Sequence, residues 1–234
     1  MNAKVIPFNP LDTKNLGASV AEAMLGGPIR PLGGLAPFPG AGIYAIYYTG
    51  DFAPYAEIAT RNAEGRFAVP IYVGKAVHAG SRKGGSSVSK SPPVSAKPLF
   101  NRLMEHAESV QAARNLSLEH FHCRFLVVDD IWIPLGESLL IARYSPLWNS
   151  LVEGFGNHDP GRGRYEGLRP RWDTLHPGRG WAERCRERDE APADIERDVA
   201  SYLRATTFPT SNRFLMETTS TEDQTPVAAS DSGA

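Results

Sequence analysis

Apolar, β-prone runs, one of which alternates with more polar residues, predict three β-strands, at residues 42–49, 69–74 and 121–128. The first two runs are rich in tyrosine, isoleucine and valine, which favour a pleated, half-buried surface. In the third run apolar residues stand at every second position, which places them on one face of a strand. These three segments predict the sheet of a protein that mixes strands and helices.

A period close to 3.6 residues predicts helices at 12–25, 98–113, 135–144 and 192–205, with a shorter one near 55–62. Proline and glycine mark where several of these helices start or stop. Pro98 suits a helix N-terminus, whereas Gly26-Gly27-Pro28 and Ser145-Pro146 end the helices before them.

The chain divides by composition into a compact middle and more polar ends. We expect an N-terminal arm at 1–40, a core at 41–153, a C-terminal extension at 154–205 and a disordered tail at 206–234. Within the core, residues 50–68 form an inserted segment, and residues 78–97 form a basic loop rich in glycine and serine.

The net charge of −1 hides an uneven distribution of charges. Residues 187–234 hold ten acidic and four basic side chains, a net of −6, which leaves +5 on residues 1–186. From Lys75 to Arg102 there are six Lys or Arg residues and no Asp or Glu. A basic body of this kind suits nucleic acid, although the overall charge does not suggest it.

The 234 residues suffice for one good core and hardly for two full domains. Cys123 and Cys185 stand far apart in the sequence, so no zinc cluster is indicated. No apolar run approaches the roughly 20 residues that span a bilayer, and the first residues lack the apolar stretch of a secretory signal. We therefore expect a cytoplasmic protein without a membrane segment.

Six polar positions are candidates for chemistry: Tyr44, Tyr72, Arg102, His106, Glu137 and Asn149. The tyrosines belong to the tripeptides Gly42-Ile43-Tyr44 and Tyr72-Val73-Gly74, each in a predicted strand. Arg102 and His106 are four residues apart and therefore share one helix face. Taken singly, each has an ordinary explanation, such as core packing for a strand tyrosine. Their joint occurrence in this order favours a common site.

In these positions, over residues 42–149, the chain resembles the GIY-YIG nuclease family. Its length, the long segment before Tyr72 and the run VEGFGNHDPGRGRY resemble the Type II restriction endonuclease branch. Two features depart from the family: Val73 replaces an isoleucine, and the 27 residues between the two tripeptides exceed the usual spacing. The resemblance implies an α/β (α+β) fold, in which helices flank a small, mainly antiparallel central sheet.

The resemblance also implies hydrolysis of DNA phosphodiester bonds to 5′-phosphate and 3′-hydroxyl ends. Tyr44 would be the general base, and Arg102 would stabilise the pentacovalent phosphate. His106 and Tyr72 would hold the phosphate or pass protons, and Asn149 would orient a substrate oxygen or its neighbours in the site.

The residues themselves add two expectations about charge. Glu137 offers one hard oxygen ligand, which suits a single Mg²⁺ per site, or Mn²⁺ in its place, completed by water and phosphate. A phenol with a pKa near 10 is a poor base at neutral pH unless cations lower that pKa. Lys75 and the water shell of the metal are the candidates for this effect.

Basic residues of the 78–97 loop and of the Arg/Gly/Pro-rich stretch after residue 154 are expected to contact double-stranded DNA. The candidates are Arg82, Lys83, Lys90, Arg162, Arg164 and Arg171. A plain flexible linker is an equal alternative for the loop. One or two of the arginines after residue 154 could read guanine in the major groove, but for any given one phosphate contact or solvation is the stronger expectation. A palindromic site cut on both strands calls for a homodimer. A restriction enzyme also implies a cognate DNA methyltransferase as a functional partner.

Two other functions stay open. A structure-specific repair or homing endonuclease would use the same core, but it would usually append a DNA-binding module, and none is visible in the sequence. A catalytically silent DNA-binding protein would keep the scaffold, yet all six candidate positions are intact.

Overall fold

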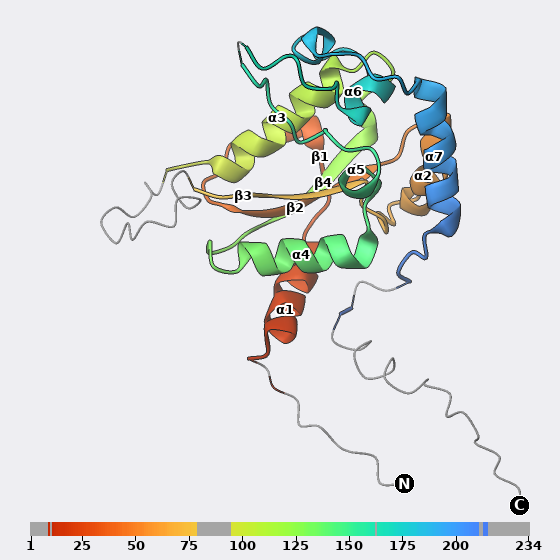
Figure 1. The fold of residues 1–234 in the computed structure, drawn as a ribbon. Helices are drawn as coiled ribbons and strands as arrows, with labels where there is room; N and C mark the ends of the chain where they lie inside the picture. Colours follow the sequence, from red (N-terminus) through yellow and green to blue (C-terminus); the bar gives the residue numbers. More distant parts are fainter. Residues whose placement is uncertain (1–8, 10, 79–94, 162, 211–212, 215–234) are drawn as a thin grey trace, which may run out of the picture.

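The computed structural model describes residues 9, 11–78, 95–161, 163–210 and 213–214. In chain order its elements are α1 (Thr13–Leu25), β1 (Arg30–Pro31), β2 (Gly42–Tyr48), α2 (Ala56–Asn62), β3 (Tyr72–Ala76), α3 (Pro98–Ala112), β4 (Phe121–Val127), α4 (Ile133–Tyr144), α5 (Leu147–Ser150), α6 (Arg171–Leu175) and α7 (Pro192–Ala205) (Figure 1). Single 3₁₀ turns lie at Leu32–Gly34, Ala53–Tyr55, Leu118–His120 and Ala182–Arg184. Most of the predicted basic loop and most of the predicted tail fall outside the described residues.

The four strands form one antiparallel sheet in the order β1-β4-β2-β3. Every residue of the central strand β2 is buried, because the strand has neighbours on both sides and helices over both faces. The predicted α+β fold with a small antiparallel sheet is thereby confirmed.

Helices cover the two faces of the sheet (Figure 1). Tyr44 and Ile46 of β2 join a core with α3 on one face, whereas Ile43 and Ala45 join a second core with α1 and α4 on the other. This division follows from the alternation of side chains along a strand. We call the two sides the α3 face and the α4 face. Among the described residues, no helix combines the length and apolar character needed to pass through a bilayer.

The segment expected to form an N-terminal arm packs onto the body from α1 onward. α1 buries Ala21 and Met24 against α4, and β1 pairs with β4 at one edge of the sheet. Leu32 belongs to the core of the α3 face. A strand of two residues has too few positions to show a period, so the sequence pattern did not predict β1.

The edge strand β3 begins at Tyr72 and not at residue 69 as predicted. The side-chain amide of Asn62 bonds both backbone groups of Val69, its N–H and its C=O each at 2.9 Å. Val69 therefore satisfies its backbone without a strand partner, and Pro70 has no N–H to offer to a ladder.

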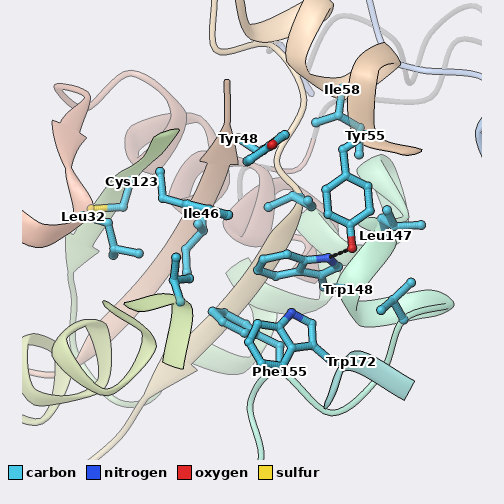
Figure 2. Packing of buried hydrophobic residues seen from close by; sticks show 14 of the residues in the cluster. Leu32, Ile46, Tyr48, Tyr55, Ile58, Cys123, Leu147, Trp148, Phe155 and Trp172 are labelled. Carbon is cyan, nitrogen blue, oxygen red and sulfur yellow. Dashed lines mark hydrogen bonds between the residues drawn. The ribbon is translucent and has the colours of Figure 1, made fainter. Parts of the chain in front are cut away.

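The C-terminal extension packs into the core of the α3 face. Figure 2 shows Trp148 of α5 among Tyr55, Phe155 and Trp172, with its indole Nε1 donating to the Tyr55 hydroxyl at 2.9 Å. The apolar stripe of α7 belongs to the same core. Residues 154–205 and the predicted core thus share one set of buried side chains.

Candidate active site

Tyr44 lies in the middle of the sheet, directly opposite Gly74 of β3. The phenol of Tyr44 passes over this glycine, and a Cβ at position 74 would lie only 2.4 Å from the hydroxyl oxygen. Any other residue at 74 would collide with the phenol. The glycine of the second tripeptide is therefore required by the tyrosine of the first.

The Tyr44 hydroxyl lies 2.6 Å from Nε2 of His106 on α3, and both side chains are buried. Burial raises the pKa of Tyr44 well above its usual value. Burial, with smaller effects from nearby cations, lowers the pKa of His106 well below its usual value. Both groups are therefore neutral near pH 7. We assign the hydroxyl as the donor, which places the imidazole proton of His106 on Nδ1.

Arg102 and Tyr72 complete this cluster on the α3 face. The ring of Tyr72 lies 5.2 Å from that of His106 and 6.2 Å from that of Tyr44. The positive charge of Arg102 lowers the pKa of both tyrosines, although the opposing effect of burial is larger. Two tyrosines, one arginine and one histidine from β2, β3 and α3 are thus brought together.

The guanidinium of Arg102 is held by three acceptors at the rim of this cluster. Its Nη2 donates to the carbonyl of Gly156 at 2.6 Å. Its Nη1 lies 2.8 Å from a carboxylate oxygen of Glu105 and 2.6 Å from Nε2 of His158. Glu105 and His158 are exposed, so both of these contacts lie at the solvent-facing side of the guanidinium. The Gly156 contact comes from more deeply placed backbone.

Lys75 and Glu137 approach from the α4 face. Lys75 pairs with Ile43 in the β2–β3 register, and its Nζ lies 2.5 Å from Oε2 of Glu137 on α4. The negative charge of Glu137 raises the pKa of Tyr44 and that of Tyr72. Larger effects come from burial on both pKa values, from Tyr72 and Arg102 on that of Tyr44, and from Arg102 on that of Tyr72. The carboxylate therefore lies within electrostatic reach of both phenols, although its helix packs on the other side of the sheet.

The structure corrects one expectation about Lys75. Lys75 was expected to lower the pKa of Tyr44, but it pairs with Glu137, and the described cation that lowers this pKa is Arg102. The reason is the strand period, since residues 74 and 75 point to opposite faces of β3.

Asn149 of α5 binds the open edge of the sheet. Its side-chain oxygen accepts from the N–H of Val73 and its side-chain nitrogen donates to the C=O of Val73, both at 2.8 Å. The backbone N–H of Trp148 also donates a hydrogen bond to the carbonyl of Ile71 at 3.0 Å. Residues of α5 thus form hydrogen bonds that a neighbouring strand would otherwise form at this edge, and they fix the backbone beside Tyr72.

Residues 154–157, here called the site turn, cover the cluster and were not among the predicted site residues. The ring of Phe155 stacks on His106 with centroids 4.5 Å apart and an interplanar angle of 15°. A Cβ at Gly156 would lie 2.7 Å from the Tyr72 hydroxyl and 3.1 Å from Nη2 of Arg102. The signal for this role was the glycine pair in EGFGN, which permits close backbone approach.

The predicted DNA-contacting residues are distributed unevenly. Arg82, Lys83, Lys90 and Arg162 lie outside the described residues, and Arg164 is exposed. Arg171 departs from the expectation, because its guanidinium binds Glu190, with Nε 3.0 Å from Oε2, and also Asp198. With its side chain only 16% exposed, Arg171 ties α7 to the core and is not available to DNA.

The donor groups of this cluster suit a divalent metal ion only if water and substrate supply most of its ligands. The described residues contain no group of three or more His, Cys, Asp or Glu side chains placed to hold a metal. Glu137 supplies one carboxylate that is 15% exposed, and its partner Lys75 is 37% exposed. One hard oxygen ligand suits a magnesium-type ion that keeps most of its water.

Comparison with known proteins identifies the domain. The family model described as the Eco29kI GIY-YIG domain matches residues 36–203, which include β2, β3 and β4, the whole cluster and the site turn. A search of the curated proteins found no significant match.

Proposed function

The chain belongs to the Eco29kI-type GIY-YIG restriction endonuclease family and is a DNA endonuclease, and from this premise we propose a Type II restriction enzyme. It would cleave both strands of double-stranded DNA at a specific site, leaving 5′-phosphate and 3′-hydroxyl ends. The observation that carries the proposal is the buried hydrogen bond between Tyr44 and His106, with Arg102 and Glu137 in electrostatic reach of the phenol.

In this proposal Tyr44 and His106 move the proton of the attacking water together. A tyrosinate is costly in this site, because burial raises the pKa of Tyr44. The hydrogen bond to His106 avoids that state: as the phenol oxygen takes a proton from water, its own proton passes to Nε2 of His106. Burial lowers the pKa of His106, so the imidazole is neutral and its Nε2 has a lone pair for this proton, and the negative charge that develops on the phosphate offsets the cost of the buried imidazolium.

Arg102 stabilises the charge that develops on the phosphate, and Tyr72 adds a hydroxyl from β3 beside it. To do so, Arg102 exchanges its exposed partners Glu105 and His158 for phosphate oxygens and keeps its bond to the Gly156 carbonyl. Asn149 has a supporting role, because it fixes the backbone of Val73 beside Tyr72.

Nucleases of this family depend on a divalent metal, and we propose Mg²⁺ held by Glu137. When bound, the ion supplies Lewis-acid polarisation of the phosphate and help for the leaving oxygen. Lys75 holds the carboxylate of Glu137 in place until then. We further propose a homodimer on a palindromic site, with Arg164 as a described candidate for DNA contact and a DNA methyltransferase as functional partner.

Incubation of the purified protein with plasmid and Mg²⁺, followed by sequencing of the ends, tests this function. Discrete fragments with 5′-phosphate ends are expected. A preference for branched substrates would favour a repair nuclease, and failure to cut with any divalent ion would refute the proposal.

A carboxylate substitution tests the metal assignment within the same assay. Glu137→Gln should lose cleavage by at least about 10³-fold while it still binds DNA, because the cations that contact phosphate remain. Glu108→Gln, at an exposed position of α3, removes one carboxylate elsewhere and serves as the matched control. Full activity of Glu137→Gln would discard Glu137 as the ligand.

A further inference from the structure

Arg179 is a buried cation that the proposed mechanism does not use. The residue is 5% exposed, and its guanidinium lies 4.6 Å from the ring of Trp172 and 4.8 Å from that of Trp181. Its Nε and Nη2 donate to the two carboxylate oxygens of Asp173, at 2.7 and 2.6 Å. This bidentate pair uses two of the five N–H groups of the arginine.

The three remaining N–H groups of Arg179 all bind the site turn. They donate to the carbonyls of Gly154, Phe155 and Asn157, at 2.8, 3.0 and 3.1 Å. Every donor of the guanidinium therefore has an acceptor. Three bonds to one short stretch of backbone fix the path of that stretch.

The site turn in turn contacts two residues of the proposed catalytic set. Phe155 stacks on the imidazole of His106, and the carbonyl of Gly156 accepts from Nη2 of Arg102. The carbonyls bound by Arg179 lie on both sides of Gly156 in the sequence. Displacement of the turn would therefore move both catalytic contacts at once.

We propose that Arg179 is a positioning residue for DNA cleavage, which holds the site turn so that Phe155 orients His106 and Gly156 orients Arg102. This inference rests on the proposed function, because it takes His106 and Arg102 as catalytic.

The geometry requires an arginine at this position. A lysine offers three donors from a single nitrogen and cannot bind both carboxylate oxygens and three carbonyls together. The charge of the residue also matters. Burial, Arg102 and His158 have the larger effects in lowering the pKa of His106, and the positive charge of Arg179 lowers it further. The other titratable groups facing His106 are Tyr44 and Tyr72.

Two substitutions separate geometry from charge. Arg179→Lys keeps the charge and loses most of the bonds, and Arg179→Met loses both. Each should lower the single-turnover cleavage rate by about 10²-fold, the usual cost of a misplacement near 1 Å. DNA affinity, measured in Ca²⁺, should change by less than about threefold, because neither variant removes a phosphate-contacting group. Only Arg179→Met should move the acidic limb of the pH–rate profile to higher pH.

Arg124→Met is the matched control for loss of a structural arginine. Arg124 donates to the carbonyls of Gly27 and Phe67 on the α4 face, away from the site turn. Thermal unfolding confirms that each variant is folded at the assay temperature. Where Arg179 variants do not fold, Gly156→Ala disturbs the same turn from the other side, and a drop of at least tenfold is expected.

Three results would overturn the inference. They are a folded Arg179→Lys that cleaves within about threefold of wild type, an equal loss in Arg124→Met, or a wild-type rate in Gly156→Ala. Arg102→Ala and the wild-type protein separate this outcome from failure of the proposed function. If wild type cleaves, Arg102→Ala is inactive and Arg179→Lys is normal, only the role of Arg179 fails. If Arg102→Ala is fully active, the catalytic role of Arg102 fails, and if wild type cuts no DNA with any divalent ion, the proposed function itself fails.

Discussion

Two buried tyrosine–histidine pairs occur in the described part of the chain, Tyr44–His106 and Tyr55–His176, and in both the hydroxyl lies 2.6 Å from Nε2. Burial raises the pKa of both tyrosines and lowers the pKa of both histidines, that of His176 to about 3. As isolated pairs they have the same chemistry.

Their surroundings differ. The outer atoms of the second pair are hydrogen-bonded to neutral groups. The Tyr55 hydroxyl accepts from Nε1 of Trp148, and Nδ1 of His176 lies 2.9 Å from Oδ1 of Asn115. A cation and a carboxylate, Arg102 and Glu137, act on the pKa of Tyr44 in the first pair, whereas the carboxylate of Glu196 acts on the pKa of Tyr55 in the second. Burial and a short hydrogen bond therefore do not distinguish the pair that we propose as catalytic from the structural one, whereas the nearby arginine does.

The largest expected effect is on the first pair. Tyr44→Phe keeps the ring over Gly74 but removes the oxygen that takes the proton from water. The single-turnover cleavage rate should fall by about 10²–10⁴-fold, the usual contribution of a general base. Circular dichroism and DNA binding serve as the checks that fold and substrate affinity are kept. Turnover near that of wild type would move the role of base to another residue.

Acidification should lower the free energy of unfolding through the histidines of both pairs. His106 and His176 are neutral in the folded protein but have ordinary pKa values near 6.5 when unfolded. Below pH 6.5 the unfolded chain therefore binds more protons, and the free energy of unfolding falls as pH falls. Each histidine contributes about 1.4 kcal/mol per pH unit, until the pH approaches the folded-state value.

Urea unfolding at pH 7 and pH 5 measures this dependence. His176→Gln should lower stability at pH 7 but lose less on acidification than wild type. An identical loss in both proteins would show that His176 is already protonated in the folded state.

The smallest effect on cleavage is expected at the second pair. Tyr55→Phe leaves the indole of Trp148 and Nε2 of His176 without their partner, at a cost of about 1–3 kcal/mol in unfolding free energy. The cleavage rate should stay within a few-fold of wild type below the unfolding transition. A loss as large as that of Tyr44→Phe would contradict the distinction between the pairs.

Much of the fold and site could be read from local patterns. The apolar period placed β2 and β4 within one residue of their observed ends, and the helical period placed Arg102 and His106 on one face of α3. The order of the two tripeptides, the helix and Glu137 was sufficient to indicate the family, since these groups recur in a fixed sequence order.

Other features depend on long-range packing that no local pattern encodes. Arg171 and Arg179 stand in the same kind of Arg/Gly/Pro-rich sequence, yet one is bound by carboxylates of the α7 region and the other is buried beneath the site turn. The side chains of Tyr44 and Lys75 point to opposite faces of the sheet because of the pairing register of β2 and β3.

The sequence by itself thus determined which side chains are the candidates for the chemistry, because residue type and periodicity are local properties. Only the tertiary structure decided how they are held: Gly74 beneath the phenol, Asn149 on the edge of β3 and Arg179 behind the site turn. The physical reason is that such contacts join residues 22 to 76 positions apart, and their geometry exists only once the chain is packed.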